Sequence, residues 1–143
     1  MISAAELWKN HPAPNKPCDT TTFPNQCAIR MGVALALTGV KLDTFSGARC
    51  YPGFKHSPRH ILRAQELANW LSEPSQIPSV GKVRKIPQSK LVKSDYLGKK
   101  GIVFLRDGWG ATDHIDVFNG KLLKGGSPSY WALGKDVWLW VLS

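Results

Sequence analysis

The hydrophobic pattern of this chain changes its period halfway along, and this change limits the fold more than any other feature of the sequence. Up to about residue 71, apolar residues recur at helical spacing, as in "CAIRMGVALALTGV" and "RHILRAQELANWL". From residue 101 the pattern becomes short and alternating, in "GIVFLRD", "HIDVFNG", "KLLKGG" and "DVWLWVLS". The sequence therefore predicts an α+β fold in which N-terminal helices pack on a C-terminal antiparallel sheet.

The first half of the sequence predicts three helices. A short amphipathic helix fits residues 2–9, before a proline-rich loop. The run that begins at Cys27 is apolar nearly all round and has Gly39 at a suitable C′ position, which indicates a buried central helix. A third, amphipathic helix fits the run from Arg59, and Pro74 should end it.

In the second half, Asn119 and Gly120 lie between two apolar runs. An Asn-Gly pair in this position is typical of a type I′ turn, which needs positive φ at both central residues. The pair therefore predicts a β-hairpin within a meander. The Pro, Ser and Lys-rich stretch between the two halves is expected to be a connector.

The size and charge of the chain limit its organisation and its partners. We expect one domain over residues 1–143, because 143 residues with 43% hydrophobic content suffice for a single core. The formal net charge of +9 should attract anions such as nucleic acid, anionic lipid or cell-wall polymer. The densest basic stretch, "GKVRKIPQSKLVKSDYLGKK", lacks interleaved aromatics, so we expect no nucleic-acid partner. Neither a membrane span nor a signal peptide is expected from the apolar runs.

Cys27 stands at the first position of the predicted central helix. The first N–H groups of a helix have no partners within it, and this environment favours a thiolate over a thiol. A structural cysteine more often lies inside an apolar element. The sequence therefore indicates Cys27 as a candidate nucleophile, with a buried capping cysteine as the alternative.

Among the four histidines, His114 is the one that opens a predicted strand. It follows the glycine-containing loop "DGWGATD", in which Trp109 either lines a cleft or packs on the hairpin. His114 and Asp116 lie two residues apart and so share one face of the strand, where the carboxylate can orient the imidazole. Asp136 and Asn119 are competitors for this role, and a solvent-facing His114 is the non-catalytic alternative.

The cysteine count leaves at least one of the three thiols free in a monomer. Cys18 and Cys50 are the natural disulfide pair, and a bridge would contribute about 3 kcal/mol. The bridge requires an oxidising compartment, and two reduced thiols are the equal alternative. Cys and His also bind zinc, but because the chain has no CxxC or HxH pair we expect no metal site and no cofactor.

The blocks "PNQCAIRMGVALALTGV", "AQELANWL" and "GWGATDHIDVFNG" resemble the fourth family of type VI secretion amidase effectors, over most of the chain from Phe23 onward. A cysteine at a helix N-terminus followed by a histidine on a sheet is similar to papain-like and NlpC-like peptidases. The resemblance implies that Cys27 is the nucleophile and His114 the general base. The family's acid usually follows the histidine by roughly ten residues. This chain has no acid there, so Asp116 is expected to replace it.

The resemblance also implies a function. It implies a toxin that the type VI secretion apparatus injects into the periplasm of a rival bacterium, which is consistent with a missing signal peptide. There it would hydrolyse the bond between D-glutamate and meso-diaminopimelate in peptidoglycan stem peptides, and a cognate immunity protein would neutralise it. Two other classes stay open: a non-enzymatic basic binding module, and another Cys-His peptidase or acyl transferase.

Overall fold

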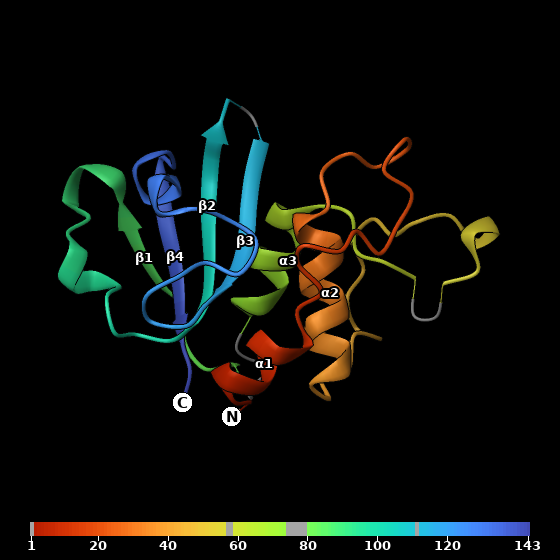
Figure 1. The fold of residues 1–143 in the computed structure, drawn as a ribbon, viewed down its shortest axis with the longest axis horizontal. Helices are drawn as coiled ribbons and strands as arrows, with labels where there is room; N and C mark the ends of the chain where they lie inside the picture. The colour runs from red at the N-terminus through yellow and green to blue at the C-terminus, as the bar shows by residue number, and fades with distance from the viewer. Residues whose placement is uncertain (1, 57–58, 74–79, 111) are drawn as a thin grey trace.

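The computed structural model describes residues 2–56, 59–73, 80–110 and 112–143. In this part of the chain, three helices lie against an antiparallel sheet of four strands (Figure 1), which confirms the predicted α+β class. The elements are α1 (Ala4–Asn10), α2 (Cys27–Leu37), α3 (Ala64–Leu71), β1 (Arg84–Pro87), β2 (Gly101–Trp109), β3 (Thr112–Phe118) and β4 (Asp136–Val141). None of the described helices is both long and apolar enough to cross a membrane.

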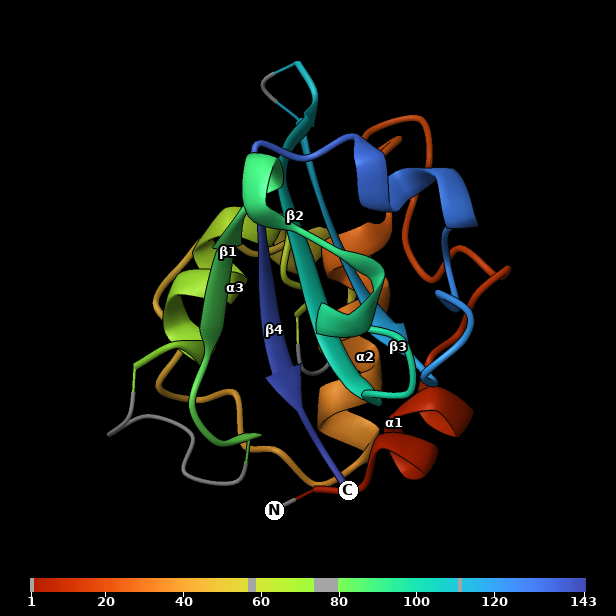
Figure 2. The same cartoon turned by 90° about the vertical axis from the view of Figure 1, so that its left-hand side faces the viewer.

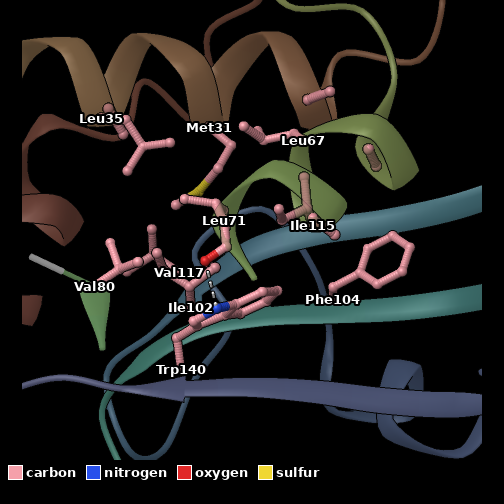
Figure 3. Packing of buried hydrophobic residues seen from close by; sticks show 14 of the residues in the cluster. Met31, Leu35, Leu67, Leu71, Val80, Ile102, Phe104, Ile115, Val117 and Trp140 are labelled. Atoms are coloured by element: carbon pink, nitrogen blue, oxygen red, sulfur yellow. Dashed lines mark hydrogen bonds between the residues drawn. The ribbon is translucent and has the colours of Figure 1, made fainter. Parts of the chain in front are cut away.

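The strand order is β1-β4-β2-β3, and Figure 2 looks onto this sheet with the helices behind it. β3 is therefore an edge strand, and it is the strand against which α2 packs. The main core lies between the sheet and the helices. Figure 3 shows its centre, where the indole Nε1 of Trp140 donates a hydrogen bond to the Leu71 carbonyl oxygen at 3.3 Å. This bond ties the last strand to the end of α3.

A second apolar cluster covers the other face of the sheet. Here the Tyr96 ring stacks on Trp131, with ring centroids 3.7 Å apart, and Trp131 belongs to the short 3-10 helix η5 (Pro128–Ala132). The segment that joins β3 to η5 lies beside the β3 edge of the sheet in Figure 2, and it places Leu123 and Trp131 in this cluster. Its position brings residues after β3 close to the polar side chains of β3.

Two of the three predicted helices agree well with the structure. Ser3 caps α1, and Gly39 has a φ of +96° just after α2, the left-handed conformation expected at C′. The third helix begins at Ala64, later than predicted, because Ile61 instead forms an antiparallel bridge with Arg49. The helical spacing upstream of Ala64 thus comes from residues that face the core from an extended segment.

The predicted hairpin at Asn119 and Gly120 is wrong. Gly120 has a positive φ but Asn119 does not. The Asn119 side chain instead accepts hydrogen bonds from the backbone N–H groups of Lys121 and Leu122. After the turn only Leu123 pairs back, in a single bridge to Phe118. β3 therefore pairs along its length with β2, and the predicted strand "KLLKGG" does not form. β1, at the other edge of the sheet, was missed because it lies in the expected connector.

Candidate active site

Cys27 is the first residue of α2, as predicted. Its backbone N–H donates to Asn25 Oδ1 at 3.1 Å, and its Sγ lies 3.8 Å from the carbonyl oxygen of Asp113. Asp113 precedes His114 on β3, so the thiol faces the start of that strand. The sulfur thus lies where the N-terminus of a buried helix meets the edge of the sheet.

Gln26 holds the chain that leads into this helix. Its side chain is buried, its Oε1 accepts from the Cys18 N–H at 3.3 Å, and its Nε2 donates to the Phe23 carbonyl oxygen. A buried amide that satisfies backbone groups on both sides fixes the loop in one conformation. The position of Cys27 therefore depends on a residue that sequence reasoning did not single out.

His114 and Asp116 are in direct contact. His114 Nε2 lies 2.8 Å from Asp116 Oδ2, and Asp116 is fully buried. The same carboxylate accepts hydrogen bonds from the Val117 and Gly125 backbone N–H groups at 2.8 and 3.0 Å. Because a carboxylate only accepts, His114 Nε2 carries the proton in this contact, which leaves Nδ1 for Cys27.

Two effects oppose each other on the His114 imidazole. Burial lowers the pKa of His114, but hydrogen bonding and negative charge from Asp116 and from Cys27 outweigh burial and raise the pKa to about 9. The imidazole therefore holds its proton at neutral pH while it faces a sulfur. A protonated imidazole beside a thiol is the pairing that cysteine hydrolases use to activate the nucleophile.

His11, the residue that follows α1, is a further member of this cluster that the sequence did not predict. Its ring is buried, its Nδ1 accepts from the Ala13 N–H at 3.3 Å, and its Nε2 lies 3.6 Å from Asp116 Oδ1. Burial lowers the pKa of His11 to about 4, although the Asp116 charge opposes this. His11 is therefore a neutral imidazole that points its N–H at the second oxygen of Asp116.

The low pKa of His11 makes the fold sensitive to acid. The unfolded histidine titrates near 6.5 and the folded one near 4, so the unfolded chain binds more protons between these values. The free energy of unfolding should therefore fall as pH falls from 6.5 to 4. Urea denaturation of wild type and His11→Gln across this range measures the effect. Equal losses in both proteins would contradict this role of His11.

The two competitors for the orienting role have other partners. Asp136 accepts from Arg106 Nε at 2.9 Å with both of its oxygens, and Asn119 accepts from backbone N–H groups of its own turn. Neither makes a contact with His114. Asp116 is therefore the acid that the fold brings to the imidazole.

A cleft of about 400 Å³ opens beside His114. Trp109 is 37% exposed and stands in its wall, with its ring centroid 5.7 Å from His114 and 4.7 Å from Tyr130. Tyr130, which the sequence analysis did not identify, also contacts the His114 ring edge to face at 5.1 Å. The cleft is lined by Pro24, Asn25, Trp109, Thr112, Asp113, His114 and Tyr130.

All three cysteines lie in described residues, and each is a buried free thiol. The predicted bridge between Cys18 and Cys50 is thus not formed in this structure. The two cysteines pack with Ile29 of α2, and their sulfurs lie beside His56 and His60. Although the sequence analysis expected no metal, these four side chains lie together.

A cysteine at the N-terminus of a buried helix, facing a histidine on an antiparallel sheet, defines the papain-like, NlpC-like class of cysteine hydrolase folds. The chain belongs to the family of type VI secretion system amidase effector protein 4 (Tae4), whose model matches residues 23–140. This confirms the resemblance read from the sequence.

Solved structures agree on the fold. The type VI effector-immunity complex Tae4-Tai4 from Salmonella Typhimurium matches with a TM-score of 0.75 and 21% identity, over 100% of this chain and 99% of that chain. The effector Tae4 from Enterobacter cloacae matches with a TM-score of 0.71 and 18% identity, over 100% and 98%. A search of curated protein sequences found no significant match.

Proposed function

We propose that this chain is a peptidoglycan amidase that cleaves the bond between D-glutamate and meso-diaminopimelate in stem peptides, with Cys27, His114 and Asp116 as its catalytic set. The observation that carries the proposal is the 2.8 Å contact of His114 with a buried Asp116, on an imidazole that also faces Cys27. Membership of an amidase effector family supports it. We propose that one amidase domain spans residues 1–143.

The reaction follows from these positions. The Cys27 thiolate attacks the amide carbonyl, His114 gives its Nδ1 proton to the leaving amine, and the acyl-enzyme is then hydrolysed by a water that His114 deprotonates. Asp116 keeps the proton on Nε2 throughout. The Cys27 N–H is the proposed oxyanion donor, and because it is bonded to Asn25 Oδ1, substrate has to displace that oxygen. No cofactor takes part in this scheme.

The place of the acid is where this chain differs from the family pattern. The family's acid follows the histidine in the segment that here contains Gly125. A Cβ at Gly125 would lie 3.5 Å from Asp116 Oδ2, and the Gly125 N–H donates to the same carboxylate. The Asp116 side chain, which belongs to β3, thus lies beside this loop. It supplies the negative charge that the family's acid supplies from the loop.

The surroundings of the reaction follow from the family. We propose that the type VI secretion apparatus delivers the chain, that it acts in the periplasm of the target bacterium, and that a cognate immunity protein binds it, as Tai4 binds Tae4 in the Salmonella complex. The net charge of +9 favours association with the anionic cell wall. Neither nucleic acid nor a membrane is needed as a partner.

Digestion of purified sacculi, followed by mass spectrometry of the released muropeptides, tests the proposal. Hydrolysis should add one water per cleavage and leave a free amine on meso-diaminopimelate. Stem peptides that stay intact would reject the amidase assignment, and a new amide on D-glutamate would indicate an acyl transferase with the same residues. A chain that binds sacculi without cleaving them would be a basic binding module.

Trp109 is expected to act on substrate binding. Trp109→Ala removes an exposed aromatic wall of the cleft, so KM should rise about threefold to tenfold with a smaller change in kcat. Steady-state kinetics on a soluble muropeptide measures both constants. Val141→Ala is the matched control. Val141 is also an exposed apolar residue, but it lies at the end of β4 that is remote from the site. A KM that stays at the wild-type value in Trp109→Ala would remove Trp109 from the binding surface.

A further inference from the structure

Four side chains that the catalytic site does not use converge beside α2, where Cys18 and Cys50 pack with Ile29. One ligand atom from each of Cys18, Cys50, His56 and His60 lies within 4.8 Å of every other. Two thiols and two imidazoles are the donor set of tetrahedral structural zinc sites. We propose that Cys18, Cys50, His56 and His60 form a structural zinc site.

The distances agree with a zinc tetrahedron. His56 Nδ1 lies 3.8 Å from Cys18 Sγ and 3.6 Å from Cys50 Sγ. With Zn–S bonds of about 2.3 Å and Zn–N bonds of about 2.0 Å, a tetrahedron has S···N edges of about 3.5 Å. The three atoms therefore stand almost where a zinc ion would hold them.

The groups around the ligands also suit a metal. The backbone N–H of His60 donates to Cys50 Sγ at 3.1 Å, the kind of outer hydrogen bond that orients a thiolate ligand. Within the described residues, His60 Nδ1 is a buried nitrogen with no hydrogen-bond partner. A buried polar atom without a partner is costly, and this one belongs to a residue that offers a ligand atom to the cluster.

The sequence contains one part of this pattern. His56 and His60 form the H-x-x-x-H pair of "HSPRH", which was overlooked when no metal site was expected from the sequence. The fold supplies the rest. The Cys50 N–H donates to the His60 carbonyl oxygen at 2.8 Å, so the two residues face each other across paired backbone. Cys18 joins them from the loop that precedes α2.

The proposed zinc would support the position of the catalytic helix without entering the reaction. Four protein ligands leave no open coordination position, which is typical of structural sites. The Cys18 N–H is bonded to Gln26, the residue before Cys27, so a metal on Cys18 would fix the chain that enters α2. Binding releases the two thiol protons to solvent and needs no oxidant. This inference does not rest on the proposed amidase activity.

The test measures metal content in the full chain, freed of any affinity tag and purified without chelator. Elemental analysis should find about one zinc per chain in wild type and in the matched control Cys27→Ser, which removes a thiol outside the site. Cys18→Ser and the double variant His56→Gln/His60→Gln should lose it. A second probe keeps the test valid if a variant misfolds: Co²⁺ added to metal-free wild type should give the visible bands of a tetrahedral dithiolate site, and Zn²⁺ should abolish them.

Three results would overturn the proposal. The first is folded, reduced wild type that retains no zinc and gives no cobalt spectrum. The second is a Cys18–Cys50 disulfide in freshly purified, zinc-free protein, which would assign the pair to a redox bridge. The third is undiminished zinc binding in a folded His56→Gln/His60→Gln variant, which would indicate adventitious metal elsewhere.

Discussion

Cys27→Ala should reduce the hydrolysis of stem peptides by about four orders of magnitude or more, because the variant has no atom that can form the acyl-enzyme. The fold should survive, since the change removes one sulfur from the first turn of α2 at a cost of about 1 kcal/mol. Muropeptide release measures the rate, and circular dichroism with thermal unfolding measures the fold.

Two controls sharpen this test. His114→Ala should cost about as much as Cys27→Ala, and the double variant no more than either one, because the two groups act as a unit. Iodoacetamide at neutral pH should label Cys27 before Cys18 or Cys50. An alanine variant that keeps more than a few per cent of wild-type turnover, or preferential labelling at another cysteine, would show that Cys27 is not the nucleophile.

Asp116→Asn should have the second largest effect, a loss of about 10³-fold to 10⁴-fold in kcat. Asp116 receives His114 Nε2 at 2.8 Å and backbone N–H groups on both oxygens. An asparagine replaces one acceptor by an NH₂ donor, so the imidazole has to accept at Nε2 and carry its proton on Nδ1. This is the wrong tautomer for a base that faces Cys27.

The pKa of His114 separates this role from simple destabilisation. Because Asp116 contributes to raising that pKa to about 9, Asp116→Asn should lower it, which NMR titration of the His114 ring protons measures. Asp136→Asn and Asn119→Ala are the matched controls, since their side chains bond Arg106 and a local turn. A large activity loss at Asp136 with little at Asp116, or an unchanged His114 pKa in Asp116→Asn, would move the orienting role away from Asp116.

Local pattern was sufficient for much of the site. Periodicity placed Cys27 at a helix start and His114 on a strand, and the two-residue repeat of a strand put Asp116 on the same face. Each of these inferences depends on neighbours within a few residues. For the same reason the sequence predicted the α+β class, with helices before the sheet.

Local pattern failed where backbone pairing over long separations decided the structure. Asn119 and Gly120 have the preferred hairpin residues, yet after one bridge between Phe118 and Leu123 the chain leaves the open edge of β3 and buries Leu123 and Trp131 in the second apolar cluster. The amphipathic spacing at Ile61 likewise served an isolated bridge to Arg49 and not a helix turn. In both places burial against distant elements outweighed local preference.

What the sequence by itself determined is the chemistry of single residues and their order along the chain: a thiol at a helix N-terminus, and an imidazole and a carboxylate on one strand face. Only the tertiary structure brought His11 to the second oxygen of Asp116, and His56 and His60 to Cys18 and Cys50. These groups come from loops without a repeating pattern. Their meeting depends on the packing of α2 against the sheet and on backbone contacts between distant segments, which no local spacing records.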